Sequence, residues 1–295
     1  MKKLKWSAFF RLVFWALFIS LSMTACLFTD KADNLNNCTT FMDNFSDETT
    51  PIIKESGSMA SSYDRYWWLN SGAYLYREGG EASTVQKKLA DKDSYKKLYE
   101  KSNPRDSDDG YRPQNLLRLV TRAKFKNFTQ QVFFKIEQIN MSASPNRNQS
   151  NGILLFHRYQ DGNNLYYVGL RVDGYAVVKK KVLGKYYTLK SIPIYPGQYN
   201  RDTLSNVLPI KQWQGIKTVI TDNSQGNVDI TLYLNDGQYG SDWKKILQVE
   251  DAGIDAERIV DKGYAGIRSD FMDVRFAHYS AIEEGVHQRK ACVAK

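Results

Sequence analysis

Cysteine is scarce in this chain of 295 residues, which contains only Cys26, Cys38 and Cys292. None of the three has the spacing of a metal site or the surroundings of a catalytic nucleophile. Dense runs of lysine and arginine are also missing, which argues against a nucleic-acid-binding protein although the net charge is +9. Between residues 41 and 280 there is neither a Pro/Gly/Ser-rich linker nor an internal repeat, so we expect one domain rather than two.

The beginning of the chain carries the pattern of a secretory signal. Four positive charges lie within residues 1–11, an apolar run follows over 12–21, and the string Met-Thr-Ala-Cys ends at Cys26. Small residues directly before a cysteine resemble the bacterial lipobox, in which the cysteine becomes the lipidated N-terminus. Met23 stands where that pattern usually has leucine.

These features predict a signal peptide over residues 1–25, a lipid on Cys26 and a polar tether over 26–40. Leu27 is not the aspartate that typically retains lipoproteins at the inner membrane. We therefore expect an outer-membrane lipoprotein of a Gram-negative bacterium, on its periplasmic or its surface face. An uncleaved membrane anchor over 12–28 and ordinary secretion are the alternatives.

A lipid on Cys26 leaves Cys38 and Cys292 as an even pair, which an oxidising compartment allows to form a disulfide. Two free thiols are the alternative. Loss of the signal's four positive charges lowers the net charge from +9 to +5. A mildly basic mature chain is compatible with an acidic polymer as partner, although charge alone does not identify one.

Segments rich in Val, Ile, Tyr, Phe and Thr alternate with turn residues, which is typical of an antiparallel β-sandwich. The expected strands lie at 41–45, 74–78, 116–125, 130–139, 152–159, 165–172, 175–182, 215–221, 228–234, 263–269 and 274–279. We expect an all-β domain over 41–282 and a C-terminal tail over 283–295. The charged segment 84–110 is expected to be an insertion with one helix over 85–100, stopped by Pro104.

Four strings in this order resemble the concanavalin A-like superfamily of jelly-roll sandwiches, especially bacterial laminin-G-like and family-16-glucanase-like domains. They are FMDNFSD, NGILLFHRYQDGNNLYYVGLRVDG, IKQWQGIKTVITDNSQGNVDITLYLNDG and GYAGIRSDFMDVRFAHYSA. The positions that carry the resemblance include Asp43, Phe45, Trp213, Tyr233, Gly237, Gly266, Asp273 and Arg275. In that fold the first and last strands are neighbours, which agrees with a bridge between Cys38 and Cys292.

The hydrolases of this superfamily carry E-x-D-x-x-E or E-x-D-x-E on one strand, which places the two catalytic carboxylates on one face. The nearest string here, at 250–257, has a different spacing and a central glycine, so the sequence predicts no catalytic residue of this type. The resemblance also implies a structural Ca²⁺ site, for which Asp43 and Asp273 are the candidate ligands. No other cofactor is expected.

Alternation in the strand at 165–172 places Tyr167 and Arg171 on the face opposite its apolar residues. The Asp-Gly turns on either side of it predict that His157, Tyr159 and Lys180 share this face. In jelly rolls this face is often a saccharide-binding groove, where tyrosine rings stack on sugars and cations bind carboxylates. The sequence thus predicts an envelope lipoprotein that binds a polysaccharide, more readily an acidic one, without catalysis.

Three alternatives remain open at this point. These side chains suit any exposed sheet face, and His157 is equally compatible with an ordinary surface histidine. Tyrosine, histidine and a cation also suit a polysaccharide lyase, which needs a base, an acid and a positive charge beside the uronate carboxylate. The strand motifs of alginate lyases have no convincing match in this chain. A purely structural envelope protein is the third alternative.

Overall fold

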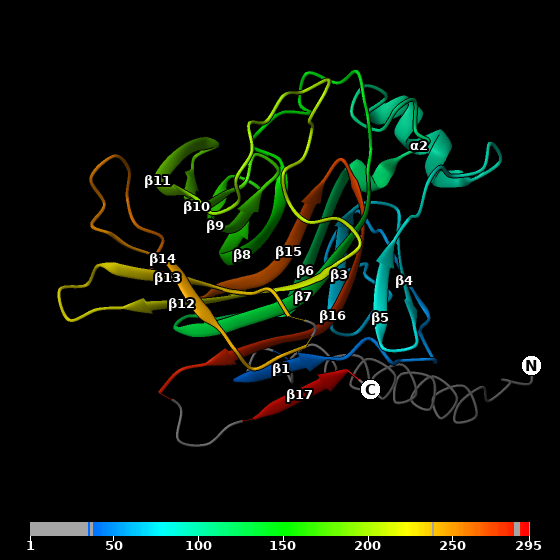
Figure 1. Cartoon of the computed structure of the whole chain (residues 1–295). Helices are drawn as coiled ribbons and strands as arrows, with labels where there is room; N and C mark the ends of the chain where they lie inside the picture. Colours follow the sequence, from blue (N-terminus) through cyan, green and yellow to red (C-terminus); the bar gives the residue numbers. More distant parts are fainter. Residues whose placement is uncertain (1–34, 36–37, 238, 286–289, 295) are drawn as a thin grey trace, which may run out of the picture. The chain divides into compact units, whose positions relative to one another are not determined.

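The computed structural model describes residues 35, 38–237, 239–285 and 290–294 (Figure 1). The chain divides into two units, Met1–Asn37 and Cys38–Lys295, and the helices and strands given below belong to the second. Cys26 and the apolar run before it lie outside the described residues, so the signal peptide and the lipid anchor stay predictions. Where the chain is described, we find no helix with the length and apolar character that crossing a bilayer requires.

Two sheets form the second unit. The first contains β1 (Thr40–Asp43), β2 (Ile52–Lys54), β4 (Tyr74–Glu78), β5 (Glu81–Thr84), β7 (Phe128–Ile139), β12 (Trp213–Asp222), β13 (Val228–Asn235), β14 (Lys244–Asp251), β16 (Met272–Glu283) and β17 (Ala291–Ala294). The second contains β3 (Trp67–Ser71), β6 (Leu116–Phe125), β8 (Gly152–Asp161), β9 (Asn164–Arg171), β10 (Tyr175–Val182), β11 (Lys185–Pro193) and β15 (Gly263–Asp270). The described part of this unit also contains the helix α2 (Ser94–Ser102) and the 3₁₀ turn η1 (Pro113–Asn115).

The strand order of the ten-stranded sheet is β14-β13-β12-β7-β16-β5-β4-β2, with β1 beside β16 and β17 beside β1. The seven-stranded sheet has the order β11-β10-β9-β8-β15-β6-β3. Between the strands named above, all pairings are antiparallel except that of β1 with β17. This arrangement confirms the expected all-β, jelly-roll sandwich. Each expected strand is present, and those at 74–78, 116–125 and 175–182 have the expected bounds.

The main core lies between the two sheets. Leu155, Val168 and Val178 are cross-strand neighbours on β8, β9 and β10, and all three are fully buried. His157, on the same face as Leu155, contacts Thr218 of the ten-stranded sheet, so this is the inner face. Burying each such aliphatic side chain stabilises the fold by roughly 1.5–3 kcal/mol, which fixes which face of each strand points inward.

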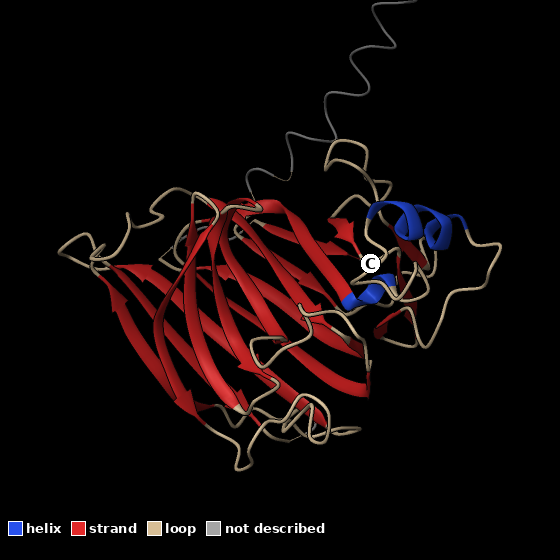
Figure 2. Ribbon diagram, turned by 90° about the horizontal axis from the view of Figure 1, so that it is seen from above, coloured by secondary structure: helices blue, strands red, loops and turns tan. Residues whose placement is uncertain are grey.

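The insertion between β5 and β6 contains a helix, but one shorter than expected. Helix α2 begins after Asp93, whose carboxylate caps it by accepting a hydrogen bond from the Tyr95 backbone N–H at 2.7 Å. The expected helix at 85–100 was placed too early, because tertiary contacts hold its first part in another conformation. Lys87 has a φ of 69° and donates its backbone N–H to Asp273 at 2.7 Å. Figure 2 shows the helix beside the strands of the sandwich.

Both ends of the sandwich meet at β1. This strand pairs antiparallel with β16 and parallel with β17, so that Phe41 lies opposite Cys292 (Figure 1). A disulfide joins Cys38, just before β1, to Cys292 in β17. The predicted bridge and the expected adjacency of the first and last strands are therefore both confirmed.

Candidate functional site

The residues predicted to share one saccharide-binding face are divided between the two faces of the seven-stranded sheet. Strand β8 pairs His157 with Tyr166 and Phe156 with Tyr167. Strand β9 in turn pairs Tyr166 with Lys180. The predicted register is wrong by one residue, so Tyr167 faces outward while His157 and Lys180 face the interior.

A bulge in β8 explains why Tyr159, two residues after the inward-facing His157, lies on the outer face with Phe156. The register shifts between His157 and Asp161, and within this stretch Arg158 has a φ of 48°. The Arg158 side chain is fully buried, donates to the Ile259 carbonyl at 2.9 Å and forms an ion pair with Asp222 at 2.8 Å. These bonds offset the strain of the left-handed backbone.

His157 is a core residue. It is fully buried, and its Nε2 lies 2.6 Å from the Thr218 hydroxyl, whereas its Nδ1 has no hydrogen-bond partner among the described residues. Burial, with a smaller contribution from the neighbouring Arg158 charge, lowers the pKa of His157 to about 3. The imidazole is thus neutral near pH 7 and is screened from any ligand at the surface.

We expect this histidine to make folding sensitive to acid. Its pKa is lowered from 6.5 to about 3 in the folded chain, so between these values the unfolded chain binds a proton that the native chain does not. Stability is complete above pH 6.5 and should fall by about 1.4 kcal/mol for each pH unit below it. Urea denaturation at pH 7, 6 and 5 measures this slope. His157→Gln should flatten it, and an unchanged slope in that variant would contradict the assignment.

Lys180 is likewise part of the interior. Its Nζ lies 2.8 Å from Asp251 Oδ1 and also donates to the Ala256 carbonyl. The Tyr166 hydroxyl donates to Asp251 Oδ2 at 2.7 Å. Since Asp251 belongs to β14, this buried network joins the edge strand of the ten-stranded sheet to β9 and β10 of the other sheet and is not available to a ligand.

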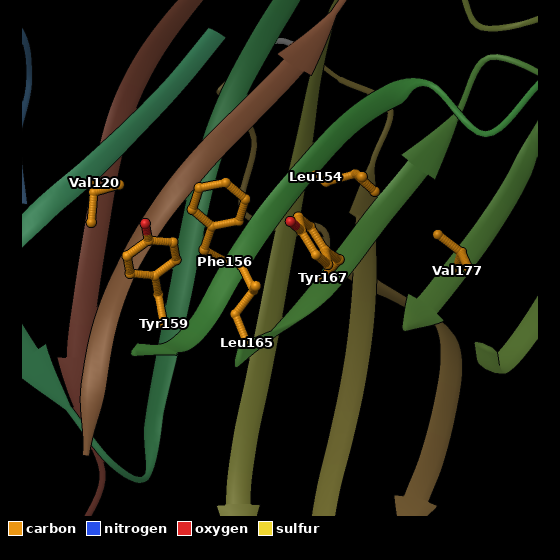
Figure 3. Packing of buried hydrophobic residues seen from close by; sticks show 7 residues of the cluster. All are labelled: Val120, Leu154, Phe156, Tyr159, Leu165, Tyr167 and Val177. Atoms are coloured by element: carbon orange, nitrogen blue, oxygen red, sulfur yellow. The ribbon is translucent and has the colours of Figure 1, made fainter. Parts of the chain in front are cut away.

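The other three predicted residues, Tyr159, Tyr167 and Arg171, lie on the outer face of the seven-stranded sheet. Tyr159 and Tyr167 are nevertheless 7% and 3% exposed, because both pack against Phe156, with ring centroids 5.6 and 5.3 Å away. Figure 3 shows these rings from neighbouring strands. Arg171 forms an ion pair with Asp173. Of the three, Tyr167 reaches a pocket.

The rings belong to an outer cluster consisting of Val120, Leu154, Phe156, Tyr159, Leu165, Tyr167 and Val177 (Figure 3). Met59, Trp68 and Tyr264 pack over part of it. Gly169 allows the backbones to approach beside Tyr167, since a Cβ at this position would lie 2.2 Å from the Ile153 carbonyl oxygen. Side chains therefore cover the outer face on the side of Met59, Trp68 and Tyr264, whereas the side near Tyr167 stays uncovered.

A pocket of about 450 Å³ occupies the open side. We call it the cation pocket, and five of its lining residues come from five strands of the sheet: Arg118 (β6), Tyr167 (β9), Lys179 (β10), Tyr186 (β11) and Arg268 (β15). Asp106 and Asp270 also line it. Volume and lining are suited to a small polar ligand or to one part of a longer one.

Arg268, which lines this pocket, is held in place by its neighbours. Its Nε donates to both oxygens of Asp270, at 2.8 and 3.0 Å, and its guanidinium carbon lies 5.4 Å from the centre of the Tyr167 ring. Burial works against its charge, but Asp270 and the two tyrosines raise the pKa of Arg268 further above its usual value. The guanidinium is a permanent, oriented cation.

The two tyrosines titrate as a pair beside Arg268. Burial raises the pKa of Tyr167 above its usual value, and Arg268 only partly opposes this. Burial acts in the same direction on Tyr186, but the charge of Arg268 and a hydrogen bond with Tyr167 outweigh it and lower the pKa of Tyr186. Tyr186 is 53% exposed, so it is the accessible member of the pair.

Cations in the pocket repel one another. Arg118 lies directly opposite Arg268 across the β6–β15 pairing, an arrangement that costs free energy for like charges. Burial lowers the pKa of Lys179, and the charges of Arg171 and Arg268 lower it further. Ion pairs at this end join Arg268 to Asp270 and Arg171 to Asp173, whereas Arg118 and Lys179 form none within the described part of the chain. An anion in the pocket would relieve this repulsion.

Sequence reasoning missed four of these five residues. Lys179 is the neighbour of the predicted Lys180, so the one-residue slip in register hid it. Tyr186 lies in a strand that was not expected, and Arg118 and Arg268 lie within expected strands but were not singled out. Arg268 belongs to a string that carries the family resemblance, which is the signal that pointed nearest to it.

The two aspartates proposed for calcium have separate environments. Asp43 accepts hydrogen bonds from Trp67 Nε1 at 2.6 Å and Arg77 Nη2 at 3.1 Å. Asp273 accepts them from Gln114 and Asn140 side-chain amides, at 2.9 and 2.8 Å. No group of three or more metal-ligating side chains occurs among the described residues. The calcium site stays a prediction, and N–H donors at both carboxylates do not favour it.

No protein-family model matches this sequence, and no curated protein matches it. Among solved structures, the carbohydrate-binding module CBM66 from Bacillus subtilis is similar at 12% identity, over 57% of this chain and 81% of that one, with a TM-score of 0.41. A prokaryotic β-1,3-1,4-glucanase (lichenase) derived from a mouse hindgut metagenome has 10% identity, coverages of 83% and 99%, and a TM-score of 0.42. The alginate lyase Aly36B has 11% identity over 85% of this chain and 99% of that one, with a TM-score of 0.41.

The protein described here is a jelly-roll β-sandwich with a cationic, tyrosine-bearing pocket on the outer face of its smaller sheet.

Proposed function

We propose that this protein binds an acidic saccharide in the cation pocket. The observation that carries the proposal is the concentration of Arg118, Lys179 and Arg268 around one opening, with Arg118 and Arg268 directly opposite each other. A carboxylate between them would replace repulsion by charge-assisted hydrogen bonds, for which the guanidinium group has the matching planar geometry.

The two tyrosines supply the other half of saccharide recognition. An aromatic ring packs against the apolar face of a sugar, while its hydroxyl bonds to sugar hydroxyls. Tyr186 is accessible for this role, and Tyr167 holds it in place with ring centroids 5.8 Å apart. The predicted lipid anchor at Cys26 would place such a domain at the outer membrane of the cell envelope, where it meets polysaccharides.

We expect the double variant Lys179→Met/Tyr186→Ala to weaken binding to a polyuronate by at least about tenfold, since hydrogen bonds to charged groups contribute roughly 1.5–3 kcal/mol each. Both side chains are partly exposed, so folding should persist. Calorimetric titration with polyuronate and with a neutral glucan is the measurement. Wild-type binding should be selective for the polyuronate and should weaken with added salt.

Lys185→Met/Tyr175→Ala is the matched control, because it removes the same charge and ring from exposed positions that do not line the pocket. Its affinity should equal that of the wild type. The proposal would be refuted if both double variants lost the same affinity for polyuronate, or if the wild-type protein preferred the neutral glucan.

Lyase activity is a second candidate, favoured by the lowered pKa of Tyr186 beside Arg268. A tyrosine held beside an arginine can take the proton next to a uronate carboxyl group, while the arginine neutralises the carboxylate. Absorbance of unsaturated uronates, followed in the same mixtures, distinguishes the two functions. A lyase would form product with the wild type and lose it with Tyr186→Phe, whereas a binding protein would form none.

A further inference from the structure

A second pocket adjoins the cation pocket. It has a volume of about 410 Å³ and is lined by Arg147, Asn148, Gln149, Ser150, Tyr199 and Arg201. Asn148 and Ser150 line both pockets, so the two openings share a wall. We call this second opening the side pocket. It is formed by the loop between β7 and β8 and the loop between β11 and β12, which lie together beyond the ends of β8, β9 and β10 (Figure 1).

The side pocket has a rigid wall. Arg147 is 6% exposed, and it donates from Nε to the Ser142 carbonyl and from Nη1 to the Arg201 carbonyl, both at 2.7 Å. Arg201 donates in return from Nη2 to the carbonyls of Ala143 and Ser144, both at 2.9 Å. Each loop thus holds the other through an arginine.

These bonds leave donors for a ligand. The guanidinium group has five N–H donors, and the bonds of Arg201 described above use only its Nη2. Arg201 forms no ion pair in the described part of the chain, and the carboxylate nearest to Arg147 is that of the highly exposed Asp202, at 3.7 Å. Tyr199 lines the same pocket as both arginines, which places its ring beside them. An aromatic ring with adjacent cations repeats the chemistry of the cation pocket.

We propose that the side pocket is a second sugar subsite, so that the ligand is an acidic polysaccharide held over at least two of its charged units. This inference rests on the proposed function, because it extends the same ligand beyond the cation pocket. Tyr199 would stack on one sugar while Arg201 binds its carboxylate. The shared wall makes one continuous ligand a better fit than two separate small ones.

The dependence of affinity on the length of the saccharide distinguishes a two-pocket site from a site for a single sugar. A ligand that reaches both pockets gains the second contact at a high effective concentration, so its affinity should exceed that of a ligand filling one pocket. We expect wild-type protein to bind a uronic acid hexasaccharide at least about tenfold more tightly than the disaccharide of the same sugar. Calorimetric titration with these two oligosaccharides is the measurement.

The variant Tyr199→Ala should lose most of the advantage of the hexasaccharide while binding the disaccharide as the wild type does. Tyr199 is partly exposed, so this variant should fold, and Arg201→Lys provides a second test that retains the charge but not the planar fork. Tyr63→Ala, at an 84% exposed tyrosine outside both pockets, is the control and should bind both oligosaccharides normally.

Equal wild-type affinity for the two lengths, or a hexasaccharide affinity unaffected by both Tyr199→Ala and Arg201→Lys, would overturn the second subsite and leave the cation pocket standing. Failure of the wild type to bind either oligosaccharide would instead overturn the proposed function, and the subsite with it.

Discussion

Replacing Lys180 by methionine is expected to destabilise the fold by about 3–5 kcal/mol, although no ligand-binding atom is removed. The substitution leaves Asp251, which is 2% exposed, as a buried charge without its cation, which otherwise lies 2.8 Å away. The Tyr166 hydroxyl remains as a donor but cannot neutralise the carboxylate. Chemical denaturation, with circular dichroism as the signal, measures the loss.

Two further variants test this explanation. Lys180→Met/Asp251→Asn should recover much of the stability, because the asparagine accepts the tyrosine hydrogen bond without an unpaired charge. Lys185→Met, at an exposed position, should change stability by no more than about 0.5 kcal/mol. If the single and double variants at Lys180 are equally unstable, lost packing and not the buried charge is responsible.

Removal of the Cys38–Cys292 disulfide should lower the free energy of unfolding by a similar amount. The bridge spans a sequence separation of 254 residues, for which the chain-entropy model gives about 5 kcal/mol as an upper figure. Cys38→Ser/Cys292→Ser is the variant, and its thermal midpoint and free energy of unfolding are compared with those of the oxidised wild type. Unchanged stability would show that the bridge does not constrain the unfolded chain.

Hydrogen exchange adds a local measurement to this comparison. Among the described strands, β17 pairs with β1 alone, and the disulfide joins it to the segment just before β1. Without the bridge, β17 should exchange its amide protons much faster, while central strands such as β8 keep their protection.

The sandwich was predictable because many of its strands alternate apolar and polar residues, and alternation with a period of two indicates a β-strand and not a helix. Strand β13 shows this well, since Val228, Ile230 and Leu232 are fully buried and alternate with half-buried positions. Strand β11 was missed for the opposite reason. It is an edge strand with half-buried and exposed positions only, so it lacks the apolar alternation on which such predictions depend, and with it Tyr186 was missed.

The candidate site was harder to predict than the fold, because its residues are brought together by register. A bulge at Arg158 has no local sequence signature, since the buried bonds that stabilise it come from residues such as Ile259, about 100 positions away. A displacement by one residue exchanges Lys179 for Lys180 and so moves the prediction from the surface to the core. Tyr167 and Arg171 were placed on the correct face because alternation within one strand does not depend on its neighbours.

The reciprocal arginine bonds between the two loops of the side pocket have a kinetic consequence. Because the two loops hold each other through these bonds, we expect binding to require no closing motion and to lose little loop entropy. Ligand capture should then occur at a rate set by diffusion and by attraction to the arginines and lysine. Discrimination among polysaccharides would reside in how long each remains bound.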